Sequence, residues 1–216
     1  MTLQIITADC LSSSKHGFFT RHGGISSGIF KGLNCGAGSS DQSDVVIKNK
    51  SLVCDAMGVS SDKLMTVHQI HSADVIISSD QVIGTNPKAD AIVSNTKGMA
   101  IGILTADCAP ILFCDQATGI VGAAHSGWQG ALKGIAQNTV KEMVNLGADI
   151  SNIRAVVGQA ERLRASANWC LSSIPSARLH SLFPGHCCRW FSPLLGFGFS
   201  NLYLKMSPKQ DCPEKH

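Results

Sequence analysis

The sequence has no long apolar run and little charge. No window of about 18 residues is both apolar and uncharged, so we expect no membrane-spanning helix. Charged residues make up 15% of the chain and hydrophobic residues 44%, a balance that excludes general disorder. The basic residues are scattered singly, so nucleic-acid binding is not predicted.

Cysteine pairs at short spacing are also missing. The nine cysteines are odd in number, irregularly placed and form no CxxC motif, which argues against a disulfide scaffold. Residues 1–10 do not have the basic flank and apolar core of a signal peptide. We therefore expect a cytoplasmic protein whose thiols are reduced and mostly buried.

Residues 1–158 alternate between strand-like and helix-like patterns. Two stretches have helical periodicity, at 45–57 before Gly58 and at 132–146 before Gly147. Short apolar runs bounded by Gly, Pro, Asp or Asn predict strands at 17–20, 64–67, 75–77, 91–93, 100–104, 111–114, 120–124 and 154–157. Many strands with few helices predict an α+β or mixed α/β fold.

Residues 159–216 break this pattern. They contain two of the three Trp, the only Tyr, five of the seven Pro and four of the nine Cys, with little periodicity of either kind. We divide the chain into a catalytic domain at 1–158 and an atypical C-terminal segment at 159–216.

Three short segments carry residues that bind metals. His71 lies in one with His68, Cys108 follows a predicted strand, and His125 ends another. If the strands are adjacent, the three side chains converge, and a Cys with two His suits Zn²⁺ with one position left for water. The alternative is that each is an ordinary buried residue. His68 and His71 would point to opposite faces of an extended segment, so we expect at most one of them in a site.

Two further segments are typical of anion binding. Gly127 and Gly130 open a predicted helix, whose free amides attract anions where the backbone approaches a ligand closely. Arg21 precedes a Gly-Gly turn and is suited to a phosphate or to a surface ion pair. An ordinary glycine-rich turn explains the first segment equally.

Taken together, the motifs resemble those of the YfiH-like family, long labelled laccase-domain or polyphenol oxidase proteins and now described as purine nucleoside phosphorylases. The resemblance covers about residues 17–158. It rests on Thr20-Arg21-x-Gly-Gly-x-Ser26, Leu33-Asn34-x-Gly36, Gln69-Ile70-His71, Ala89-Asp90-Ala91, Leu104-Thr105-Ala106-Asp107-Cys108 and Ala124-His125-Ser126-Gly127-Trp128.

The resemblance implies a single-domain, mixed-sheet layered α/β sandwich with zinc at His71, Cys108 and His125. It implies phosphorolysis of adenosine, inosine and S-methyl-5′-thioadenosine, together with adenosine deamination, so nucleosides and phosphate are the expected partners. Motif matching assigns Arg21, Asn34 and Gly127 to substrate binding and Arg21 and Asp107 to catalysis. Asp107 fits a proton carrier or a turn cap equally well. A homodimer is left open.

The older oxidase label is tested by the histidines. A laccase-type copper cluster needs His-x-His pairs, and the eight histidines of this chain form none. Cu²⁺ can still occupy a site made of His and Cys, because it binds such ligands more tightly than Zn²⁺ does.

The chain departs from the family at two places. Gln129 stands where relatives carry Arg or Lys, which removes a cation from the expected anion site. After Gly158 the family's Gly-Pro-rich and Tyr-Glu-Val segments are missing. This change motivates the hypothesis that the reading frame shifts near Gly158.

Two other functions compete with the nucleoside enzyme. One is a cysteine-dependent hydrolase in which His125 activates Cys108 as a nucleophile. The other is an inactive metal-binding relative with a damaged C-terminus.

Overall fold

The computed structural model describes residues 2–78, 84–158, 178–181 and 201–206. Its eleven described strands form two sheets. The five-stranded sheet has the order β1 (Ile5–Ile6), β2 (His16–Phe19), β11 (Asn201–Met206), β6 (Ala100–Thr105) and β3 (Leu64–Met65). The six-stranded sheet has the order β10 (Arg178–Ser181), β9 (Ile153–Val157), β7 (Ala109–Asp115), β8 (Val121–Ser126), β5 (Ala91–Ser94) and β4 (Val75–Ile77).

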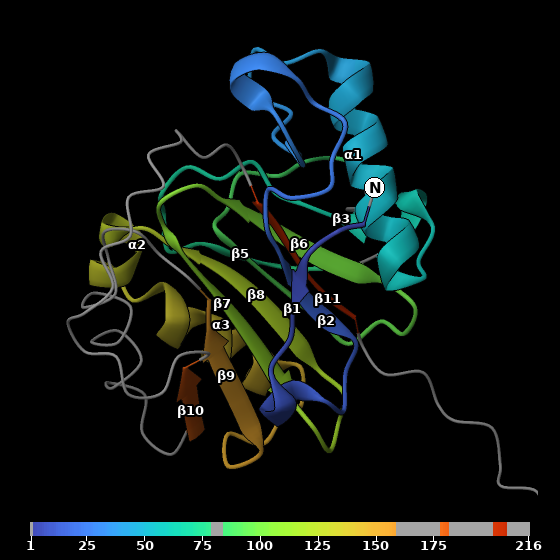
Figure 1. Cartoon of the computed structure of the whole chain (residues 1–216). Helices are drawn as coiled ribbons and strands as arrows, with labels where there is room; N and C mark the ends of the chain where they lie inside the picture. The colour runs from blue at the N-terminus through green and yellow to red at the C-terminus, as the bar shows by residue number, and fades with distance from the viewer. Residues whose placement is uncertain (1, 79–83, 159–177, 182–200, 207–216) are drawn as a thin grey trace, which may run out of the picture.

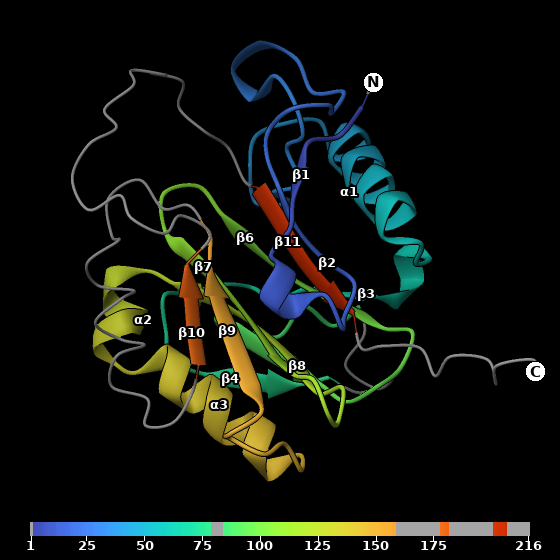
Figure 2. The same ribbon diagram turned by 60° about the horizontal axis from the view of Figure 1, so that its bottom comes forward.

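The two sheets pack face to face, and helices cover their outer faces (Figures 1 and 2). Helix α1 (Ser43–Met57) lies against the five-stranded sheet, while α2 (Trp128–Leu132) and α3 (Ile135–Asn145) lie against the other. Short 3₁₀ turns occur at Asp9–Leu11, Gly28–Phe30 and Ser61–Lys63. The mixed-sheet α/β sandwich predicted from the sequence is confirmed.

Alternating residues of β6 explain this layering. Ile101 and Ile103 face the core between the sheets, whereas Ala100 and Leu104 face α1. A strand places successive side chains on opposite faces, so a strand covered on both sides reads as one apolar run. That is why β5 to β9 were visible in the sequence.

One predicted helix was wrong in its extent. The stretch 132–146 was expected to be a single helix, but the structure has α2 and α3 with a break at Lys133 and Gly134. Gly134 has a φ of 83°, a left-handed conformation that interrupts the helical hydrogen bonds. Gly58 ends α1 as predicted, with a φ of 63°.

Two strands of the segment 159–216 were not predicted. Strand β10 pairs in parallel with β9, and β11 lies antiparallel between β2 and β6, in the middle of its sheet. The other predictions for this segment fall on residues outside the described ranges. Among the described residues, no helix is long and apolar enough to cross a bilayer.

Candidate metal centre

The topology brings several chain segments to one edge of the sandwich. Strand β6 ends shortly before Cys108, and β8 ends just after His125. The segment carrying His71 leads into β4, and Asp90 immediately precedes β5. In the ladder, Ala91 lies opposite Ala124, and the backbone N–H of His125 donates to the Asp90 carbonyl at 2.7 Å. Residues far apart in the sequence therefore meet at this edge.

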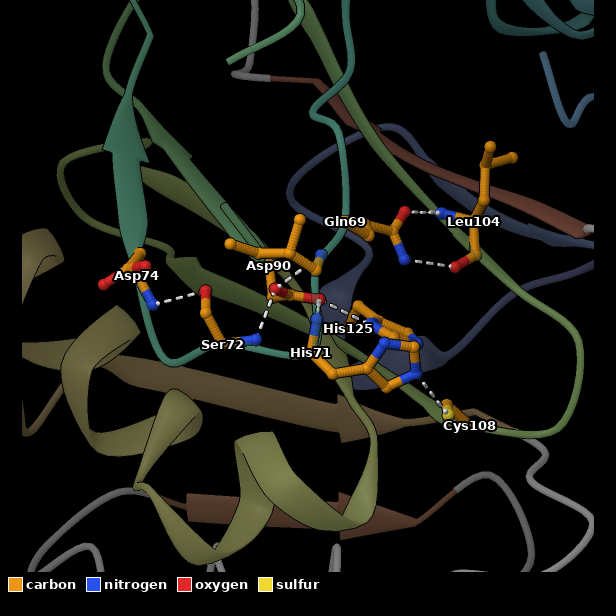
Figure 3. Close-up of polar contacts among 9 residues, drawn as sticks. Gln69, His71, Ser72, Asp74, Asp90, Leu104, Cys108 and His125 are labelled. Carbon is orange, nitrogen blue, oxygen red and sulfur yellow. Dashed lines mark hydrogen bonds and ion pairs between the residues drawn. The ribbon is translucent and has the colours of Figure 1, made fainter. Parts of the chain in front are cut away.

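His71, Cys108 and His125 form a cluster there. One ligand atom from each residue lies within 4.8 Å of the others, and Figure 3 shows the two imidazole rings beside the thiol. The rings meet edge to face, with centroids 4.9 Å apart. His125 is buried, Cys108 half-buried and His71 exposed, so the cluster opens to the surface on one side.

Asp90 fixes the orientation of His125. Its Oδ1 lies 2.7 Å from His125 Nδ1, and both side chains are buried. An ionised carboxylate only accepts hydrogen bonds, so Nδ1 is the donor and Nε2 is the ring nitrogen that would bind a metal, on loss of its proton. This carboxylate–histidine arrangement is common behind metal-bound imidazoles.

The same carboxylate also shapes the backbone at His71. It accepts hydrogen bonds from the backbone N–H groups of Ile70, His71 and Ser72, at 3.1, 3.1 and 2.6 Å (Figure 3). His71 has a φ of 59°, an uncommon left-handed conformation for a residue with a side chain. Asp90 thus holds one ligand by its ring and another by its backbone.

The charges of this pair stabilise each other. Burial opposes ionisation of Asp90, but hydrogen bonds from His125 and from the backbone of Ser72 and Ile70 lower its pKa to about 2. Burial likewise opposes a charged His125, but the hydrogen bonds to Asp90 and Cys108 raise its pKa to about 9. The cluster is therefore an electrostatically coupled unit even without an ion.

The donor set and its packing fit a metal such as zinc. A tetrahedral zinc with ordinary bond lengths places a sulfur and a nitrogen ligand about 3.6 Å apart, and Cys108 Sγ lies 4.0 Å from His71 Nε2. Gly127 makes room for both side chains. A Cβ there would lie 2.9 Å from His71 Cδ2 and 3.1 Å from Cys108 Sγ.

The other predicted site residues have different surroundings. Asp107 is exposed beside Cys108. The Arg21 guanidinium donates from Nη2 to the Lys31 carbonyl at 2.9 Å. Asn34 is 1% exposed, and its amide is engaged in its own loop. Its Nδ2 donates to Ser39 and Asp41, and its Oδ1 accepts from the backbone of Gly36. None of these contacts reaches the cluster.

Sequence reasoning missed two residues of this edge. In the sequence, Asp90 is part of a family motif and was assigned no role. Its position directly before a buried strand was the signal that could have pointed to it. Gln69 was the other. Its amide donates to the Leu104 carbonyl at 2.7 Å and accepts from the Leu104 N–H at 2.8 Å, which ties the His71 segment to β6.

Comparison with known proteins shows the family of this chain. The family model described as multi-copper polyphenol oxidoreductase laccase matches residues 15–163. The chain belongs to this family. A solved structure of a Neisseria meningitidis protein is similar to this chain, with a TM-score of 0.79 and 24% identity over 97% of this chain and 100% of that one. The hypothetical protein YfiH of Bacillus licheniformis has a TM-score of 0.80 and 20% identity over 94% of this chain and 96% of that one. These similarities establish a YfiH-like fold.

Curated relatives of this chain carry an enzyme name. A Deinococcus radiodurans protein named purine nucleoside phosphorylase is 39% identical over 143 residues, which are 66% of this chain and 55% of that protein. A Streptomyces coelicolor protein of the same name is 35% identical over 154 residues, or 70% of this chain and 63% of that protein. The chain thus spans less than two thirds of the length of these two relatives.

Proposed function

We propose that the protein is a zinc-dependent purine nucleoside phosphorylase that also deaminates adenosine. The observation that carries this proposal is the convergence of His71, Cys108 and His125, backed by Asp90, at one edge of the fold. The names of the curated relatives support the phosphorylase reaction. The expected nucleosides are adenosine, inosine and S-methyl-5′-thioadenosine.

The residues of the site suit both reactions in this proposal. His71, Cys108 and His125 would hold zinc, which would supply an activated water for deamination by lowering the pKa of that water to about 7. Asp107 is exposed and adjacent in sequence to Cys108, which supports a role for it in carrying a proton between the site and solvent. Phosphorolysis needs phosphate held near the ribose while positive charge develops on the sugar. Arg21, which closely follows β2 in the other sheet, is the candidate for holding this phosphate.

Product analysis tests this function. Zinc-loaded protein is incubated with adenosine, with and without phosphate, alongside His125→Ala and the matched control His22→Ala at an exposed histidine. We expect adenine only with phosphate, inosine in both cases, and neither product from His125→Ala. A folded, zinc-loaded protein that forms no product would contradict the proposal and favour the inactive metal-binding relative.

A cysteine-dependent hydrolase is the second candidate, because the Cys108 thiol lies beside an imidazole, 4.0 Å from His71 Nε2. Iodoacetamide labelling separates the two functions. A thiolate bound to zinc is not a free nucleophile, so stoichiometric zinc should protect Cys108 from alkylation. Rapid labelling of the zinc-loaded protein, with loss of a hydrolytic activity, would favour the hydrolase.

We also propose that the reading frame of the coding sequence shifts near Gly158, so that residues 159–216 are translated in a different frame. Residues 1–158 would then be the part inherited intact from the family. The end of the family match at residue 163 supports this division. Resequencing the locus and measuring the mass of the expressed protein test it. An intact frame that encodes this same segment would refute the proposal.

A further inference from the structure

A cavity lies beside the segment that leads to His71. Its volume is about 590 Å³, within the usual range for small-molecule sites. The Gly36–Ser39 turn, α1 and the 66–69 segment contribute to its wall. Gln69 lines it and is only two residues from His71, so their Cα atoms are at most about 7 Å apart. The cavity and the metal centre are therefore neighbours.

The lining of this cavity is positive and polar. Lys50 and His68 line it, and no Asp or Glu is among its described lining residues. Lys50 is half-buried, and its Nζ has no carboxylate within ion-pair distance among the described residues. By contrast, Lys48 on the same helix is exposed and pairs with Asp44 at 3.8 Å. Lys50 thus offers an uncompensated charge to the cavity.

The turn between Asn34 and Asp41 adds hydrogen-bond donors. Ala37 and Gly38 line the cavity, and in the described part of the chain their backbone N–H groups make no hydrogen bond. Successive free amides in a turn form a concave site for anions. The turn is held firmly, because Asn34 Nδ2 donates to Ser39 Oγ and Ser39 Oγ donates to the Gly36 carbonyl. The donors are therefore fixed before a ligand arrives.

We propose that this cavity binds a phosphate group through Lys50, His68 and the amides of Ala37 and Gly38. Free phosphate and a sugar phosphate share this chemistry. The binding claim stands on the cavity itself, whereas its part in phosphorolysis rests on the proposed function. Asn34, assigned to substrate binding from the sequence, would then act by positioning the turn.

Calorimetric titration of the zinc-loaded full chain tests the proposal. Inorganic phosphate and ribose 1-phosphate are titrated in separate arms, into the wild type, Lys50→Met, Lys50→Arg and the control Lys48→Met. We expect at least a tenfold loss of affinity in Lys50→Met, partial retention in Lys50→Arg, and no change in Lys48→Met. Lys50-dependent binding of either probe supports the site and identifies its ligand. Binding of neither probe, or equal binding to Lys50→Met, overturns it.

A second pair of variants guards against a folding defect in Lys50→Met. A Cβ at Gly38 meets no atom within 4 Å, so both Gly38→Asp and Gly38→Asn fit. The added carboxylate should repel phosphate and reduce its affinity at least tenfold relative to the isosteric Asn variant. Equal affinities of these two variants would count against the site.

The kinetics separate this proposal from the enzyme function. In an active enzyme, Lys50→Met should raise KM for phosphate and leave KM for the nucleoside within about twofold of the wild type. Lys50-dependent phosphate binding without turnover would refute the phosphorylase and leave the site intact. Turnover with an unchanged KM for phosphate would refute the cavity's part in phosphorolysis and leave the enzyme function intact.

Discussion

Asp90 Oδ1 accepts a hydrogen bond from His125 Nδ1 at 2.7 Å, while the same carboxylate accepts from the backbone N–H of His71 at 3.1 Å. One buried side chain therefore orients two of the three candidate ligands. The preorganisation of the cluster rests on a residue that has no ligand role itself.

Replacing Asp90 should weaken metal binding. Asp90→Asn keeps the size of the side chain but loses the charge that polarises His125, and loss of such a partner typically costs 10–100-fold in metal affinity. Chelator competition with zinc measures this effect. Asp74→Asn, at an exposed carboxylate immediately before β4, is the control and should bind as the wild type. An unchanged affinity in Asp90→Asn would show that the hydrogen bond does not tune the ligand.

Gly127→Ala should disrupt the cluster by steric crowding. The new Cβ would lie 2.9 Å from His71 Cδ2, closer than Cβ atoms normally approach carbon, so a ligand must move. We expect less than one zinc per chain by elemental analysis. Ser126→Ala is the control, because its buried hydroxyl has no hydrogen-bond partner among the described residues. Full zinc content in Gly127→Ala would mean that the ring shifts without loss of the site.

Zinc removal should destabilise the fold. A ligand that binds only the native state stabilises it by about 4 kcal/mol when present at a thousand times its Kd. Treatment with a chelator should therefore lower Tm, and added zinc should restore it. His125→Ala should have the same Tm with and without zinc. A wild-type Tm that does not respond to zinc would argue against a native metal site.

The sequence predicted the elements of this edge better than their arrangement. His125 and Cys108 were correctly placed at strand ends, because buried strands are short apolar runs with clear boundaries. Their meeting depends on pairing between non-consecutive strands and on the packing of two sheets, which no local pattern encodes. Asp90 was missed for the same reason, since its partners are 18 to 35 residues away.

Local patterns failed where tertiary pairing decides the structure. Strand β11 pairs with two strands that are distant in sequence. The alternation of Leu202, Leu204 and Met206 with polar residues was a local signal for it, but the run is short and was overlooked. The break at Gly134 was missed because one glycine within an otherwise helical pattern is often tolerated. Both differences lie outside the cluster and leave its ligands in place.

Gln69→Ala should destabilise the protein through the backbone of Leu104. It removes both partners of that residue, whose N–H and carbonyl bond to the Gln69 amide. Leaving a buried backbone group unpaired costs about 1–3 kcal/mol, and the groups of Leu104 are part-buried, so we expect a loss toward the lower end of that range for each. Gln116→Ala, which removes one bond from an exposed side chain to the Cys10 carbonyl, should cost less. Urea denaturation measures both changes, and equal losses would contradict this account.

Acid should weaken the loop around Asp41. Hydrogen bonds from Ser26 Oγ, at 2.7 Å, and from Asn34 Nδ2, at 2.9 Å, lower the pKa of this carboxyl below its ordinary value of 3.8. A carboxyl whose pKa is lower in the folded state stabilises the fold above its unfolded pKa, and this contribution is lost as the pH falls through the folded value. Asp41→Asn should therefore lower Tm at neutral pH and reduce the decrease of Tm below about pH 4. Ser26→Ala, which removes the largest cause of the shift, should reduce that decrease in the same direction. Thermal melts across this range test both variants, and an acid dependence identical to the wild type in both would show that the Asp41 carboxylate contributes nothing to folding.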